Sequence, residues 1–305
     1  MNRRKWMQAT TTLGALCALG AVCALCGARW AQAGSPPEKA VNTPNGAQLQ
    51  TQLQTATTHP MKYYISLPPD WSSDRTWPVL VAPSAHYSAK SKTIELFAPI
   101  RDARKSRLII VAPLVINADP IASMKEYRGA VMDAISAADA APSAEGRDEV
   151  ARAKFDSEGI MAVIRDVKAL YHGEDKFYIT GFSASTHVAY MFLFAHPELL
   201  KGVVINSGVY LGRGVDESHI PLMNSPVRAN LDILYIIGAN DPGYKVCMEN
   251  WRETKAQLLS YGHKAAKIRE EVIQKGNPER LNPGHNWFPT KVLGFCDAVE
   301  LTFRK

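Results

Sequence analysis

Cysteine is scarce in this chain. Among 305 residues there are five cysteines, and three of them, at positions 17, 23 and 26, lie within the first 33 residues. If that segment is removed, as argued below, Cys247 and Cys296 remain, which is too few for a disulfide framework. No group of histidine, cysteine and aspartate residues has the spacing of metal ligands. The sequence therefore predicts neither a disulfide-rich scaffold nor a metal site.

Beyond residue 33, the chain has almost no excess of positive charge. The chain has 35 lysine and arginine residues against 29 aspartate and glutamate residues. Four of the basic residues lie in residues 1–33, which contain no acidic residue, so the rest of the chain has 31 basic against 29 acidic residues. It has no basic stripe with interleaved aromatic residues and no internal repeat. We therefore expect no nucleic-acid partner.

Residues 1–33 have the pattern of an export signal. A basic start, Arg3-Arg4-Lys5, precedes an apolar stretch over residues 11–27 and the small-residue site Ala31-Gln32-Ala33. The paired arginines favour a twin-arginine signal; an ordinary secretory signal and an uncleaved membrane anchor are the alternatives. We expect cleavage after Ala33, a periplasmic or secreted protein, and no stable membrane association after cleavage.

The remainder of the chain has the length of one large α/β domain. Residues 34–47 are rich in proline, asparagine and glycine and predict a flexible leader. Residues 48–305 are expected to form a single catalytic domain. Within it, residues 48–57 and 61–67 alternate in polarity and predict an antiparallel hairpin at a sheet edge.

The interior of the domain alternates between short apolar runs and segments of helical period. Unbroken apolar runs are typical of parallel strands that are covered on both faces. The predicted strands are 79–82, 108–112, 177–180, 202–206, 233–237 and the more polar 267–273. The predicted helices are 91–104, 147–171, 183–196, 244–261 and 289–303. This order predicts an α/β fold with a mainly parallel central sheet and helices on both faces.

The pentapeptide Gly181-Phe182-Ser183-Ala184-Ser185 joins one of these strands to a helix. A serine on such a corner is typical of a nucleophile, and the corner requires small residues two positions before and after it. The usual last glycine is serine here, followed by Thr186. The alternative interpretation is a turn serine that caps the helix.

A serine nucleophile requires a base, and the base requires an acid that holds its tautomer. Asp241 is the candidate acid, because it lies in a tight loop, Gly238 to Pro242, directly after the predicted strand 233–237. His285 is the candidate base, because it lies in a loop after Gly284 and before the last helix. His263 stands at a helix end, where we expect it to complement the helix dipole. Asp241 could instead be a turn residue, and His285 an ordinary loop histidine.

Two backbone N–H groups are candidates for the oxyanion hole that an acyl transfer requires. One is the N–H of Ala184, and the other is the N–H of His86 in the loop after residues 79–82. Two insertions, residues 117–149 and 209–230, follow strand ends at the edge where α/β sheets bind ligands. We expect them to line the substrate cleft; the alternative is that they face solvent.

The two remaining cysteines could form a disulfide in an oxidising compartment. Cys247 follows the loop of the candidate acid, and Cys296 follows the loop of the candidate base. A bridge between them would tether both loops, and the alternative is two unconnected buried thiols.

Several segments together resemble the α/β-hydrolases, and within them the secreted polyhydroxybutyrate depolymerase and feruloyl esterase-like esterases. The similar segments are Tyr64 to Pro68, Trp77 to Val81, Phe177 to Ser183, Gly238 with Asp241, and Gly284-His285. The resemblance implies an α/β-hydrolase fold and a Ser-Asp-His esterase with Ser183, Asp241 and His285. The chain departs from the family at Ser84-Ala85, where His-Gly is usual, and at Ser185-Thr186, where glycines are usual.

The sequence therefore predicts an exported serine esterase that works through an acyl-enzyme and needs no cofactor. We expect a small-molecule or oligomeric ester as substrate, because no surface-binding module accompanies the domain. A peptidase or an acyltransferase could use the same three residues. A hydrolase-like protein that binds a ligand without turnover is the alternative from another class, and the two departures motivate it.

Overall fold

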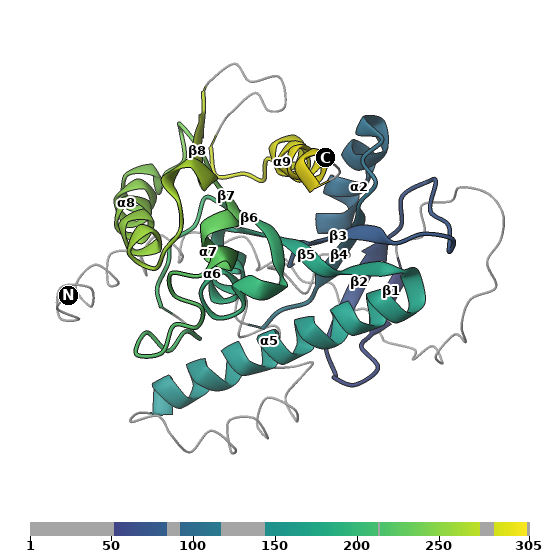
Figure 1. Ribbon diagram of the computed structural model, residues 1–305, viewed down its shortest axis with the longest axis horizontal. Coiled ribbons are helices and arrows are strands. Elements are labelled where there is room, and N and C mark those ends of the chain that lie inside the picture. The colour runs from purple at the N-terminus through teal and green to yellow at the C-terminus, as the bar shows by residue number, and fades with distance from the viewer. Residues whose placement is uncertain (1–51, 84–91, 117–143, 213, 275–283, 304–305) are drawn as a thin grey trace, which may run out of the picture. The chain divides into compact units, whose positions relative to one another are not determined.

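A computed structural model describes residues 52–83, 92–116, 144–212, 214–274 and 284–303. Its centre is an eight-stranded sheet with the strand order β1-β2-β4-β3-β5-β6-β7-β8 (Figure 1). The strands are β1 (Gln52–Thr55), β2 (Lys62–Ser66), β3 (Trp77–Val81), β4 (Ile109–Pro113), β5 (Gly173–Phe182), β6 (Leu200–Asn206), β7 (Asp232–Gly238) and β8 (Ile268–Ile273). The predicted export signal and leader, residues 1–47, lie outside the described residues.

The sheet is parallel from β4 to β8 and antiparallel only at its start. β1 and β2 pair as a hairpin, and β2 pairs antiparallel with β4, with Tyr63 opposite Pro113. The five pairings from β4–β3 to β7–β8 are all parallel. The predicted hairpin and the predicted parallel strands are therefore confirmed.

Helices cover both faces of the sheet, as Figure 1 shows. They are α2 (Lys92–Arg104), α5 (Ala144–Tyr171), α6 (Thr186–Ala195), α7 (Pro226–Asn230), α8 (Tyr244–Ser260) and α9 (Pro289–Phe303), with the 3-10 turns η1 (Ser183–Ser185), η2 (Pro197–Leu199) and η3 (Ala265–Lys267). α5, α6 and α8 pack against one face in one apolar cluster, while α2 and α9 pack against the other face in a second cluster. The alternation of side chains along each strand separates the two clusters.

Strand β3 illustrates why apolar runs mark these strands. Val79 and Val81 face the cluster of α5, α6 and α8, whereas Leu80 between them faces the cluster of α2 and α9. All three side chains are fully buried. Burial of each such side chain stabilises the fold by about 1.5–3 kcal/mol, so a strand covered on both faces gains from every position instead of every second one.

The structure describes only some residues of the two insertions that were predicted from the sequence. Residues 117–143 of the first predicted insertion lie outside the described residues. The second predicted insertion, residues 209–230, is a loop that ends in the short helix α7 and is described except for residue 213. Among the described residues, no helix has the length and apolarity needed to cross a membrane.

Arg228 of α7 is a fully buried cation that ties three segments together. Its guanidinium donates hydrogen bonds to the carbonyl oxygens of Leu193 and Phe194 near the end of α6, and to the carbonyl oxygen of Pro221. Carbonyl groups in the last turn of a helix have no partner within the helix, so the guanidinium satisfies them and complements the helix dipole.

The same guanidinium contacts His263, which changes the expected role of that histidine. The Nη1 atom of Arg228 lies 3.3 Å from Nε2 of His263, and the histidine is 4% exposed. Burial, and then the positive charge of Arg228, lower the pKa of His263 from 6.5 to about 4. The imidazole is therefore neutral near pH 7 and accepts a hydrogen bond from Arg228, so the expectation of a charged helix cap is wrong.

Stability should fall in acid because of His263. Between pH 6.5 and about 4, the unfolded chain binds a proton at this residue and the folded chain does not, so lowering the pH favours unfolding. We expect the free energy of unfolding to decrease over this window, by on the order of 2 kcal/mol from this group. Urea unfolding of wild type and His263→Gln at several pH values measures the effect. Equal pH slopes for the two proteins would contradict it.

Candidate active site

Ser183 lies on a sharp turn between β5 and α6. Its φ angle is +52°, a left-handed conformation that is uncommon for a residue with a side chain. A Cβ atom added to Gly181 would lie 2.6 Å from the carbonyl oxygen of Ser185 and 2.6 Å from the Cα atom of Thr186. Position 181 therefore has to be glycine, as the pattern predicted. A strained backbone of this kind is typical of functional sites.

Two hydroxyl groups brace the turn where glycines are usual. The Oγ atom of Ser185 accepts a hydrogen bond from the N–H of Phe182 at 2.9 Å and donates one to the Phe182 carbonyl at 3.0 Å. The Oγ1 atom of Thr186 donates to the Ser183 carbonyl at 2.6 Å. Ser185 and Thr186 thus hold the two residues of the turn by local bonds between side chain and backbone.

The space for Thr186 comes from a glycine in the loop after β6. A Cβ atom added to Gly208, two residues after β6, would lie 2.0 Å from the Thr186 Oγ1 atom. The departure at position 186 is therefore matched by a small residue at position 208. Because the two residues are 22 positions apart, no inspection of the pentapeptide alone could find this match.

The candidate oxyanion donors are described only in part. Ala184 is the second residue of η1, where backbone N–H groups have no partner within the helix, and both Ser183 and Ala184 are partly exposed. The N–H of Ala184 is thus available to a negatively charged oxygen next to Ser183. His86 lies outside the described residues.

Asp241 lies three residues after the end of β7, at the edge of the sheet to which β5 delivers Ser183. The backbone turns sharply here, because the N–H of Asp241 bonds to the Gly238 carbonyl and the N–H of Tyr244 bonds to the Asp241 carbonyl. Only 1% of the side chain is exposed. The Asp241 carboxylate is therefore fixed by the loop rather than free in solvent.

The carboxylate of Asp241 has hydrogen-bond partners on several sides. Its Oδ2 atom lies 2.8 Å from Nδ1 of His285, and its Oδ1 atom accepts from the N–H of Gly243 at 2.8 Å. Burial alone would raise the pKa of Asp241, but the bonds from His285, Gly243 and the Ser207 side chain outweigh it and lower the pKa. Asp241 is therefore ionised at neutral pH, in a position to hold the imidazole.

His285 lies between this carboxylate and the turn of Ser183. The side chain of His285 is 41% exposed, and its ring centre is 4.6 Å from that of Phe182, the residue before Ser183. The ring of Phe182 also packs 5.3 Å from that of Trp287. The structure thus brings Asp241 and His285 together and places the imidazole against the neighbour of Ser183.

The end of β6 contributes residues that the sequence analysis missed. Ser207 has a φ angle of +51°, is buried, and bonds through its side chain to Asp241. Asn206, the last residue of β6, is also buried and bonds to the loop that carries His285. The signal in the sequence was a polar pair that directly follows the apolar run 203–205 at the carboxyl end of a parallel strand.

The disulfide considered from the sequence is not formed. Cys247 and Cys296 are both free and buried. Cys247 of α8 belongs to the apolar cluster on one face of the sheet, and Cys296 of α9 belongs to the cluster on the opposite face. The sheet separates the two thiols, so the alternative of two unconnected buried cysteines is correct.

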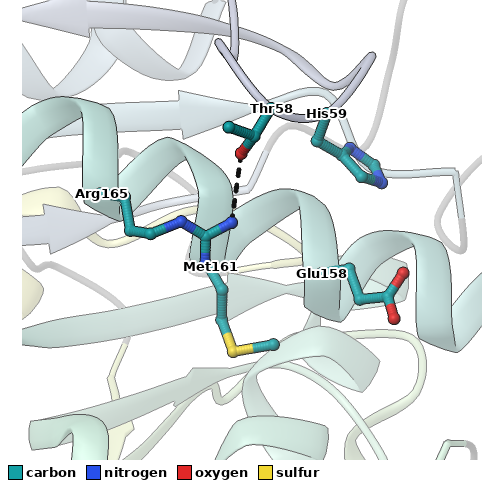
Figure 2. Close-up of a pocket in the computed structure, with 5 residues that line it drawn as sticks. All are labelled: Thr58, His59, Glu158, Met161 and Arg165. Atoms are coloured by element: carbon teal, nitrogen blue, oxygen red, sulfur yellow. Dashed lines mark hydrogen bonds between the residues drawn. The ribbon is translucent and has the colours of Figure 1, made fainter.

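A surface pocket lies apart from these residues. It has a volume of about 230 Å³ and is lined by Thr58, His59, Glu158, Met161 and Arg165. Figure 2 shows Arg165 donating a hydrogen bond to the Thr58 hydroxyl across it, at 3.2 Å. The Nδ1 atom of His59 accepts from the N–H of Met61, and burial lowers the pKa of His59. Neither serine nor cysteine is among the described residues that line this pocket, and its threonine hydroxyl accepts a hydrogen bond from Arg165.

No group of three or more histidine, cysteine, aspartate or glutamate residues is placed to hold a metal ion in the described part of the chain. The N–H of Gly243 and the imidazole of His285 form hydrogen bonds with the Asp241 carboxylate.

The match between Thr186 and Gly208 can be tested by a double-mutant cycle. Gly208→Ala should reduce the free energy of unfolding by about 1–3 kcal/mol, because the new methyl group meets the Thr186 side chain. Thr186→Gly alone should cost about 1 kcal/mol. In the Thr186→Gly background, Gly208→Ala should cost less than in wild type by about 1 kcal/mol or more. Equal costs in the two backgrounds, measured by urea unfolding, would refute the steric match.

Comparison with known proteins finds likeness in three dimensions only. No family model matches the chain, and no curated protein matches its sequence. An S-formylglutathione hydrolase from Agrobacterium tumefaciens has a TM-score of 0.52 and 12% identity, and the match covers 82% of this chain and 93% of that one. A CE1 ferulic acid esterase from Anaeromyces mucronatus has a TM-score of 0.52 and 13% identity, with 87% and 93% covered.

A thermostable esterase has a TM-score of 0.50 and 17% identity, and the match covers 84% of this chain. It covers 62% of the esterase, so this chain spans less than two thirds of that protein. Sequence identities of 12–17% support a shared fold and do not show a shared activity. The sheet order, the covering helices and these likenesses together show that the chain has the α/β-hydrolase fold.

Proposed function

We propose that this protein is a serine hydrolase that cleaves carboxylic esters through an acyl-enzyme. The observation that carries the proposal is the hydrogen bond between Nδ1 of His285 and Oδ2 of Asp241, 2.8 Å long, beside the strained turn of Ser183. A buried acid, an imidazole and a serine on a strand-to-helix corner, in this chain order, match the arrangement of α/β-hydrolase triads. The chemistry follows from the three residues and needs no cofactor.

In the first half of the reaction, His285 takes the proton of the Ser183 hydroxyl as its oxygen attacks the ester carbonyl carbon. Asp241 accepts the hydrogen bond from Nδ1 of the imidazole, which leaves Nε2 free to take that proton. The bond to the alcohol oxygen then breaks, and the alcohol leaves with the proton from His285. The N–H of Ala184, with that of His86 as the second donor, stabilises the negative oxygen of the intermediate.

In the second half, water replaces the alcohol. His285 takes a proton from the water, the hydroxide oxygen attacks the acyl carbon, and the bond to Ser183 breaks. The proton returns to the Ser183 oxygen, and the carboxylic acid is released. Asp241 stays ionised throughout, consistent with the bonds that lower its pKa.

The surroundings of His285 support an ester with apolar groups. The partly exposed ring of Phe182 packs against the imidazole, and the partly exposed ring of Trp287 packs against Phe182. Apolar side chains with a few polar groups are typical of pockets for small organic ligands. We infer that the substrate is a small-molecule or oligomeric ester. The three named structural relatives are esterases or a hydrolase, which supports this reaction class without choosing the substrate.

We also propose that the protein works outside the cytoplasm. The basic start, the apolar stretch and the small-residue site of residues 1–33 support export to the periplasm or beyond the cell. Cys247 and Cys296 are both free and buried, and the proposed reaction uses neither thiol.

The test of the nucleophile is Ser183→Ala with a panel of p-nitrophenyl esters of different acyl length. The variant should lose roughly 10⁴-fold or more in kcat, because it lacks the hydroxyl that forms the proposed acyl-enzyme. Ser260→Ala, on the exposed side of α8, is the matched control and should keep the wild-type rate. A folded wild-type protein without turnover of esters, peptides or acyl-transfer substrates would refute the proposal. Turnover of peptides or acyl transfer alone would favour the peptidase or the acyltransferase on the same residues.

The test of the acid compares the two ends of β7. Asp241→Asn should reduce kcat by about 10⁴-fold, because an amide can fix the wrong tautomer of His285. Asp232→Asn is the matched control, since Asp232 begins the same strand at the opposite edge of the sheet and pairs with Lys267. Its kcat should stay within about twofold of wild type, as expected for a loss near the surface. Equal losses in the two variants would contradict the assignment of Asp241.

A further inference from the structure

Asn206 occupies the centre of the edge on which the proposed site is built. It is the last residue of β6, and it pairs with Phe182 of β5 on one side and with Ile236 of β7 on the other. Its exposure is 0%. A polar amide is costly to bury unless both its donor and its acceptor are bonded, so the partners of this side chain indicate its role.

Both ends of the Asn206 amide bond to the loop that carries His285. The Nδ2 group donates to the carbonyl oxygen of Asn286 at 2.8 Å, and the Oδ1 atom accepts from the N–H of Phe288 at 3.1 Å. These two backbone groups lie on either side of Trp287. The amide therefore holds the backbone that directly follows His285, and its orientation is fixed because one partner can only accept and the other can only donate.

Ser207, the residue after Asn206, holds Asp241, which is the hydrogen-bond partner of His285. The side chain of Ser207 bonds to the Asp241 carboxylate, and the N–H of Ser207 bonds to the carbonyl oxygen of Ile236 in β7. One dipeptide at the end of β6 thus holds the histidine loop through Asn206 and the acid through Ser207.

We propose that Asn206 is a positioning residue, which keeps the His285 imidazole in register with Asp241 and with the turn of Ser183. This inference rests on the proposed function, in which His285 is the base. The imidazole is 41% exposed, so solvent contacts it on one side and the loop backbone must supply much of its order. Loss of the Asn206 bonds would allow the loop to move, and the imidazole would spend less time in the bond to Asp241.

Asn206→Leu tests the inference, because leucine has the same branching and number of side-chain heavy atoms and neither donates nor accepts. The kcat for a p-nitrophenyl ester should fall by roughly 10- to 100-fold with KM nearly unchanged, since a misplaced base slows the chemical step. Asn206→Asp is the second variant, because it keeps the volume and the acceptor for Phe288 but loses the donor to Asn286. Asn206→Asp should also lower kcat with KM nearly unchanged, and it replaces the leucine variant in the test if that variant does not fold.

The matched control is Asn250→Leu. Asn250 of α8 is also a buried asparagine whose amide bridges backbone, to the N–H of Tyr210 at 2.7 Å and to its carbonyl oxygen at 3.0 Å. It is bonded to a different loop from that of His285. Its loss should lower the thermal midpoint about as much as the loss of Asn206, which separates general destabilisation from a specific effect on His285.

The deciding readout is the tautomer of His285, from the ¹⁵N shifts of its ring at alkaline pH, assigned by their absence in His285→Gln. Wild type and Asn250→Leu should show the Nδ1–H form, and the Asn206 variants should shift toward the Nε2–H form that free imidazole prefers. An unchanged tautomer with a kcat no lower than that of Asn250→Leu would overturn the inference. A wild-type protein that hydrolyses no ester, but loses the Nδ1–H form on substitution of Asn206, would overturn the proposed function alone.

Discussion

A serine held at positive φ directly after a buried strand is the constraint on which the rest of the site depends. The corner at Ser183 exists only because Gly181 has no side chain, since a Cβ atom there would lie 2.6 Å from backbone atoms of the next turn. It is braced by the hydroxyls of Ser185 and Thr186, and Gly208, two residues after the neighbouring strand β6, leaves room for Thr186. The strained turn of Ser183 is thus supported by its neighbours and does not require the usual glycine pattern.

The parallel sheet converts separate stretches of sequence into one cluster. β5, β6 and β7 are neighbours and end at the same edge, so the residues that follow them meet there. β5 brings Ser183, β6 brings Asn206 and Ser207, and β7 brings Asp241. His285 lies on the connection between β8 and α9, and side chains at the end of β6 bond to that segment and to Asp241.

Much of this was predictable from the sequence, and the exceptions share a physical reason. Asp241 and His285 are 44 residues apart, and their pairing was predicted from the loops that carry them and from their order along the chain. The strands and the covering helices follow local rules, namely apolar runs and helical period. Contacts between distant segments do not, so the match of Thr186 with Gly208 and the bonds of Asn206 were missed. The disulfide considered from the sequence is absent for the same reason, because the positions of Cys247 and Cys296 along the chain did not reveal that they lie on opposite faces of the sheet. The lowered pKa of His263 depends first on its burial and then on the charge of Arg228, which is 35 residues away.

The central claim is that the strained serine of this turn is the group that becomes acylated. Its most direct test is to treat the folded wild-type protein with a fluorophosphonate and to locate the adduct by peptide mass spectrometry. The account predicts a single adduct on Ser183, with the nearby Ser185 unmodified because its hydroxyl is buried and bonded to Phe182. An adduct on another residue, or a folded protein that takes up no label, would contradict it.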